Sequence, residues 1–257
     1  MLFPTLNNEY WFITTYVGLY ILSPFLNWAL RQINRRQHLL LLMVLILLFS
    51  VWPALSFLSS GLNIGGMFSV GWFIVLYCIG AYIRKYYVIR KAWLRLLGFY
   101  LLFSSALPAS KFIFARITQK TSCTFIPEDL FFSYHSVLVL GASVFLFLLF
   151  LNLDIRYELP KKVILWLAPA TLGVYLIHDN LYVRAWIWPV LAMHQYVPGN
   201  YIWLLIPGVV TVIYVGCTVL EKLRAAMFGR ITGSRWLDER CRRIEELFSE
   251  LYGRMKE

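Results

Sequence analysis

The amino-acid sequence predicts an all-α fold, a polytopic transmembrane helical bundle of about seven spans. Of its 257 residues, 60% are hydrophobic and only 14% are charged, whereas soluble domains carry about 25% charged residues. Aromatic residues make up 18% of the chain, and Trp and Tyr are enriched where membrane helices meet the headgroups. These observations exclude an ordinary water-soluble core.

Apolar runs suited to spanning helices recur along the whole chain. A helix that crosses the bilayer needs about 20 mainly apolar residues. Such runs lie at 9–30, 39–59, 68–83, 94–110, 135–153, 163–178 and 201–220. The third, fourth and sixth runs are short and are interrupted by polar or small residues, so one of them could be re-entrant.

The basic residues predict how these helices are oriented. Clusters of Arg and Lys follow the first, third, fifth and seventh runs, whereas the loop 60–67 carries no charge. Cytoplasmic loops of membrane proteins are enriched in Lys and Arg, so we expect an N-out/C-in arrangement in the plasma membrane. The net charge of +11 then comes from the basic residues that orient the helices. We therefore expect membrane lipids as partners and no binding of nucleic acid.

This orientation places Met1 outside, although the first residues, MLFPTLNNE, contain no basic flank and no signal peptide. We therefore expect further helices upstream of this chain. A protein that naturally begins outside with a short polar segment is the alternative.

The C-terminal end of the chain is basic and amphipathic, unlike the apolar runs before it. We divide the chain into a transmembrane domain, 1–220, and a basic cytoplasmic tail, 221–257. Apolar residues recur in the tail at three- to five-residue steps between Arg and Glu, at Trp236, Cys241, Ile244, Leu247, Phe248, Leu251 and Met255. This spacing predicts an amphipathic helix, which either lies on the inner membrane surface or forms a seam with a partner helix.

The segment ATLGVYLIHDNLYVR, residues 170–184, contains the sharpest candidate for catalysis. His178 and Asp179 end an apolar run where bilayer is expected to give way to water. A neutral imidazole can take a proton from a sugar hydroxyl, and Arg184 can pair with Asp179 or with an anionic substrate. Residues that simply cap a helix at the membrane surface would produce the same pattern.

Aromatic side chains on two helices are candidates for lining the bundle interior. Tyr16 and Tyr20 are four residues apart and share one face of the first helix. Trp72 and Tyr77 lie in the third run, Tyr77 near its middle. Together with Tyr175 and Arg184 these residues are the predicted substrate-binding set. Aromatic packing without substrate contact is the competing interpretation.

Basic residues after the third run are candidates for binding a cofactor. Arg84, Lys85 and Arg90 have the side chains that suit phosphate oxygens, such as those of coenzyme A, although they also serve as an orientation signal. His135, at the outer start of the fifth run, and His194, in the last outer loop, are expected to face solvent. The four cysteines show no CxxC pair or metal-ligand spacing, so we expect no metal.

Three segments together resemble a known family. YWFITTYVGLYILSPFLN, FSVGWFIVLYCIGAYIRKY and ATLGVYLIHDNLYVR are similar to the later helices of the acyltransferase 3 family, which are bacterial integral-membrane O-acyltransferases. The resemblance covers most of residues 9–185 in the expected order. It implies a ten-helix bundle of which this chain contains the last seven helices. It also implies transfer of an acetyl or other short acyl group from acyl-CoA to a hydroxyl of a cell-surface polysaccharide or lipid-linked glycan.

One motif of that family is absent. Its catalytic signature is an Arg or Lys followed, after ten residues, by a His. The residues eleven positions before the four histidines are Asn27, Thr124, Leu167 and Val183. We therefore expect an incomplete or inactive form of the enzyme. The competing hypothesis is a non-enzymatic membrane component of polysaccharide export or assembly.

Overall fold

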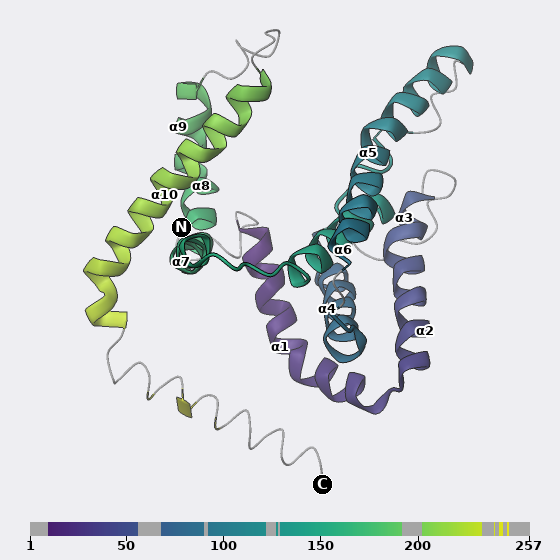
Figure 1. The fold of residues 1–257 in the computed structure, drawn as a ribbon, viewed down its shortest axis with the longest axis horizontal. Coiled ribbons are helices and arrows are strands. Elements are labelled where there is room, and N and C mark those ends of the chain that lie inside the picture. The colour runs from purple at the N-terminus through teal and green to yellow at the C-terminus, as the bar shows by residue number, and fades with distance from the viewer. Residues whose placement is uncertain are drawn as a thin grey trace. The chain divides into compact units, whose positions relative to one another are not determined.

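The computed structural model describes residues 10–55, 68–89, 92–121, 127, 129–191 and 202–232, together with four single positions in the tail (Figure 1). All the regular elements in these ranges are helical, which confirms the predicted all-α class. Five helical segments among them are long and apolar enough to cross a membrane. The predicted number of about seven spans and their orientation stay predictions.

The chain divides into two compact units. The N-terminal unit comprises Trp11–Asp154, and the C-terminal unit comprises Ile155–Glu257 together with Met1–Tyr10. The N-terminal unit contains α1 (Trp11–Gln32), α2 (Arg35–Ile46), the π-turn η2 (Leu47–Val51), α3 (Trp52–Ala54), α4 (Val70–Tyr86), α5 (Trp93–Thr121) and α6 (Val137–Leu151).

A capping box starts α2, directly after the end of α1. The side chain of Asn34 accepts a hydrogen bond from the backbone N–H of Gln37, and the Gln37 side chain accepts one from the backbone N–H of Asn34. The two bonds satisfy donors that the first turn of a helix leaves open. The chain therefore reverses direction between two apolar runs at a short polar turn.

The second predicted run is one distorted helical segment. Pro53 has no backbone N–H, and its ring would clash with the carbonyl of Phe49 four residues earlier. The π-turn at Leu47–Val51 widens the helix at this point and so removes the clash.

Helix α4 lies in the core of the N-terminal unit. Val75 is fully buried and Trp72 is 4% exposed, and both pack with Leu140 of α6. On the opposite part of α4, Cys78 packs with Leu30 and Leu42 of the first two helices. The buried residues of α4 thus contact α1, α2 and α6, although α4 was among the shorter predicted spans.

The end of α5 differs from the sequence prediction. The apolar run was expected to end at 110, but α5 continues to Thr121. The added residues include Ala, Arg, Lys and Gln, which are strong helix formers. Hydropathy detects only the apolar part of such a helix, and the polar continuation was therefore read as a loop.

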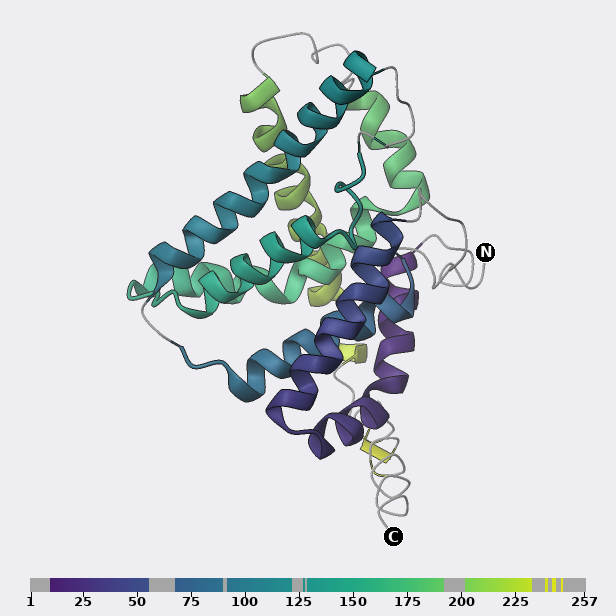
Figure 2. The same ribbon diagram turned by 90° about the vertical axis from the view of Figure 1, so that its right-hand side faces the viewer.

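The C-terminal unit contains α7 (Glu158–Leu167), the 3₁₀ turn η3 (Ala168–Ala170), α8 (Thr171–His178), α9 (Leu181–Leu191) and α10 (Ile202–Thr232). Helix α7 is seen end-on in Figure 1, whereas α8, α9 and α10 are seen from the side. In the view turned by 90° (Figure 2), α7 runs across the picture. The sixth predicted run therefore bends at η3, where Pro169 interrupts the helical hydrogen bonds.

The boundary that we predicted between 220 and 221 falls inside α10, which continues to Thr232. The amphipathic tail helix lies almost wholly outside the described residues. Of its charged residues, Arg242 and Glu246 form an i,i+4 ion pair with 3.8 Å between nitrogen and oxygen.

Candidate functional site

His178 is the last residue of α8, and a hydrogen bond sets the state of its imidazole. Its Nδ1 lies 2.7 Å from the carbonyl oxygen of Val174, one turn earlier. A carbonyl can only accept, so Nδ1 carries the proton and donates it. The lone pair of the neutral ring is then on Nε2. In this tautomer Nε2 is the nitrogen that can accept a proton.

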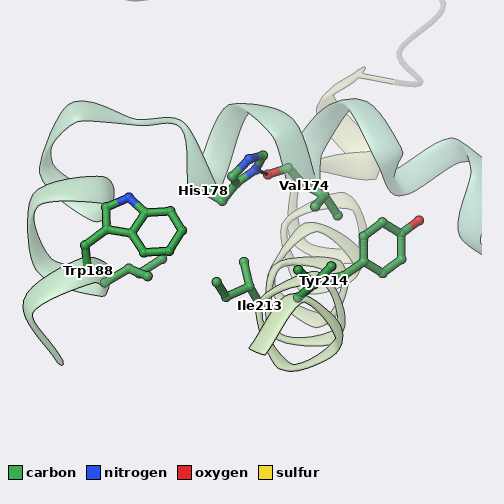
Figure 3. Close-up of a pocket in the computed structure, with 7 residues that line it drawn as sticks. Val174, His178, Trp188, Ile213 and Tyr214 are labelled. Atoms are coloured by element: carbon green, nitrogen blue, oxygen red, sulfur yellow. Dashed lines mark hydrogen bonds between the residues drawn. The ribbon is translucent and has the colours of Figure 1, made fainter. Parts of the chain in front are cut away.

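A pocket adjoins this imidazole. Its volume is about 280 Å³ and it lies between α8, α9 and α10 (Figure 3). We call it the α8–α10 pocket, and it is lined by Val174, His178, Ile187, Trp188, Val210, Ile213 and Tyr214. In Figure 3 the hydroxyl of Tyr214 points away from Trp188 and His178. The walls near the imidazole are therefore aliphatic and aromatic.

Asp179 does not orient His178. Its carboxylate pairs with Arg184 on α9, with 3.4 Å between Oδ1 and the guanidinium nitrogen. Adjacent residues of a helix do not face one another, whereas residue 184 lies one turn into the next helix. The ring of Tyr175 lies beside His178, with 6.1 Å between centroids.

Two residues of this region were missed by the sequence analysis. The amide nitrogen of Asn180 donates to the hydroxyl of Tyr10 at 3.0 Å, and that hydroxyl donates to the carbonyl of Leu176 at 3.1 Å. The Asn180 carbonyl oxygen accepts from the backbone N–H of Tyr182 at the start of α9. An amide inside an apolar segment needs partners, which could have drawn attention to Asn180. Nothing in the sequence indicates Tyr10.

His178 and Asp179 lie at a break within a longer apolar segment. Helix α9 follows after a turn at 179–180 and adds 11 residues that are mostly apolar. Successive residues of α8 and α9 lie beside progressively earlier residues of α10. Gly173 lies at Glu221, His178 lines a pocket with Tyr214, and Leu191 lines a second pocket with residues of 204–212. Helices α8 and α9 thus follow α10 in the opposite direction. The predicted end of the sixth apolar run at His178 is confirmed, because the candidate membrane span Glu158–His178 ends there; the sequence analysis did not predict the further apolar helix α9.

The start of α8 is packed tightly on α10. A Cβ atom at Gly173 would overlap the side chain of Glu221. The Glu221 carboxylate is held in place by Arg224, with oxygen–nitrogen distances of 2.6 and 2.8 Å. Lys222 lies over the ring of Trp166 at 4.8 Å. These contacts place the helix that carries His178.

The other predicted substrate-binding residues lie in the N-terminal unit, Tyr16 and Tyr20 on α1 and Trp72 and Tyr77 on α4. Tyr16 and Tyr20 are 52% and 67% exposed on α1, whereas Trp72 is 4% exposed. The hydroxyl of Tyr77 donates to Oδ1 of Asn27 at 2.8 Å. In the described ranges, no group of three or more His, Cys, Asp or Glu side chains is placed to hold a metal ion.

Comparison with known proteins identifies the family. A family model described as an acyltransferase domain, that of the acyltransferase 3 family, matches residues 1–221. The chain belongs to the acyltransferase 3 family. Comparison with curated proteins and with solved structures gives no match.

One residue of the predicted cofactor-binding set in this member of the acyltransferase 3 family has a structural contact. The ammonium of Lys85 donates to the carbonyl oxygens of Leu30 and Ile33, at 3.3 and 3.1 Å. Cations bonded to the last carbonyls of a helix stabilise it. Arg84 is exposed, and Arg90 lies outside the described residues.

We expect Lys85→Met to lower the free energy of unfolding by about 0.5–1 kcal/mol, because the end of α1 loses a cation. Thermal unfolding of the purified acyltransferase in detergent measures the effect. Arg84→Met is the matched control, since it removes the neighbouring charge without removing these two bonds. Equal unfolding temperatures for the two variants would contradict a capping role for Lys85.

His135 is not solvent-facing as predicted. Its ring lies 6.3 Å from the ring of buried Trp72, and its Nδ1 is buried without a hydrogen-bond partner among the described residues. Burial lowers the pKa of His135, because a charged imidazole loses its hydration there. His194, the other histidine expected to face solvent, lies outside the described residues.

This burial predicts a pH dependence of stability. In the unfolded chain His135 titrates near its ordinary pKa of about 6.5, and in the folded protein its pKa is lower. Between the two values the unfolded chain binds more protons, so stability is lost as pH falls below about 6.5. Unfolding temperatures measured across this pH range should drop less for His135→Gln than for the wild type. An unchanged pH dependence in the variant would contradict the assignment.

Proposed function

We propose that this acyltransferase 3 member is an O-acyltransferase of the plasma membrane. It takes an acyl group from acyl-CoA, with acetyl-CoA as the simplest donor, and transfers it to a hydroxyl of a cell-surface polysaccharide or lipid-linked glycan. The family supplies the reaction class. The observation that carries the proposal is the Val174–His178 hydrogen bond, which leaves Nε2 as a base beside the α8–α10 pocket.

The chemistry requires one proton transfer that His178 is suited to perform. Nε2 takes the proton of the acceptor hydroxyl while the hydroxyl oxygen attacks the thioester carbonyl carbon. The carbon–sulfur bond then breaks, and the imidazolium returns the proton to the thiolate. The products are the ester and free coenzyme A. Arg184, half-exposed and paired with Asp179, is placed to attract an anionic part of the substrate.

The experiment is a chromosomal deletion with complementation. Ester-linked acyl groups of the surface polymer are released by mild alkali and identified by mass spectrometry, and the amount of polymer is measured in parallel. Loss of acyl groups from polymer made in normal amount, restored by the gene in its chromosomal form, supports the proposal. Loss of the polymer itself contradicts it and favours a component of polysaccharide export or assembly.

A further inference from the structure

The α8–α10 pocket combines one basic atom with apolar walls. The imidazole of His178 forms part of its wall, and Val174, Ile187, Val210 and Ile213 supply aliphatic surface. Trp188 closes one side, and its ring faces the pocket in Figure 3. A molecule that fits such a pocket is apolar over most of its length and can meet the imidazole at one end.

The volume of the pocket limits which molecules can fill it. A cavity of about 150 Å³ lined by Leu, Ile and Phe holds benzene, and the α8–α10 pocket has about 280 Å³. It therefore has room for roughly ten carbon atoms by the same ratio. The single methyl of an acetyl group would leave most of this space empty, and a carbohydrate would leave its hydroxyls unpaired against aliphatic walls.

We propose that the α8–α10 pocket binds the aliphatic chain of the transferred acyl group and that this chain is of medium length or branched. The proposal rests on the proposed function, because the acyltransferase reaction is what brings an acyl chain to His178. The thioester carbonyl lies at the imidazole end, where the acceptor hydroxyl gives its proton to Nε2. Ile213 and Trp188 then determine which chain lengths fit.

The competing occupant is a membrane lipid tail, since the surrounding helices are apolar. A lipid tail fits the aliphatic walls but has no use for the lone pair of Nε2. Neither a lipid ester nor a thioester offers a proton to an acceptor nitrogen, but the acceptor hydroxyl of the transfer reaction does. The position of the imidazole at the pocket therefore favours a reacting acyl group beside a hydroxyl.

Photolabelling of the full chain in lipid nanodiscs tests the site directly. The probe is a medium-chain acyl-CoA with a diazirine in the chain and a terminal alkyne, and labelled peptides are identified by mass spectrometry. We expect label on the α9 and α10 segments that contain Trp188 and Ile213, and competition by the same acyl-CoA without the diazirine. Ile213→Trp fills the pocket and should remove most of this label.

Val215→Trp is the matched control, since Val215 lies two residues away on α10 and is 52% exposed. It should keep the label. Ile213→Ala, which enlarges the pocket, should keep the label and favour longer chains, and it covers the case in which Ile213→Trp does not fold. Equal labelling of Ile213→Trp and Val215→Trp would overturn the proposal. So would a phospholipid probe with the same chain that labels equally and resists competition by acyl-CoA.

The two proposals fail in different ways. Labelling of the pocket in a protein whose deletion leaves the acyl content of the polymer unchanged would overturn the proposed function and keep the acyl-chain site. Loss of acyl groups on deletion, with no label in the pocket, would overturn the site and keep the function.

Discussion

Replacing His178 with glutamine is expected to slow acyl transfer by about 10²- to 10⁴-fold, the range that a positioned general base contributes. Glutamine keeps a polar group of similar length at the end of α8, but its amide cannot take the proton from the acceptor hydroxyl. The measurement is the initial rate of ester formation with membranes that contain wild-type or variant protein. The amount of protein and its unfolding temperature are recorded for both.

Tyr182→Phe is the control for this substitution. Tyr182 lies four residues further along the same broken segment and is 80% exposed, so the loss of its hydroxyl should leave the rate unchanged. A full rate in His178→Gln would remove His178 from the catalytic site. Its hydrogen bond to Val174 would then be a helix-end contact and no more.

Valine at Gly173 is expected to lower the free energy of unfolding by about 1–3 kcal/mol, the cost of adding atoms to a packed contact. The added carbons would overlap the Glu221 side chain, which Arg224 holds in place on the other side. Either the Glu221 side chain gives up its ion pair with Arg224, or the helix that carries His178 moves away from α10. Thermal unfolding in detergent measures the loss of stability, and the transfer rate should fall with it.

Gly216→Ala is the matched control on α10. A Cβ atom at Gly216 would meet nothing within 4 Å, so alanine there should raise stability by about 0.5–1 kcal/mol, because glycine weakens a helix interior. If Gly173→Val unfolds at the wild-type temperature, the contact between Gly173 and Glu221 does not determine how α8 packs.

Local features of the sequence predicted most of the helices. Runs such as 9–30 and 201–220 correspond to α1 and α10, because hydropathy depends only on residues close together in the chain. The prediction was wrong where a helix continues beyond its apolar part, as in α5, and where a run bends, as at Pro169. It also missed α9, because the Arg, Asp and Asn around 179–184 looked like the end of a membrane segment.

The sequence alone determined that this is an all-α chain with helices apolar enough for a membrane, and it singled out the block that contains His178. Both depend on composition and local order. Only the tertiary structure decided what surrounds that histidine. The α8–α10 pocket is lined by residues from Val174 to Tyr214, and Tyr10 reaches Asn180 across 170 positions. Which atoms meet across such separations depends on packing, and no local pattern contains that information.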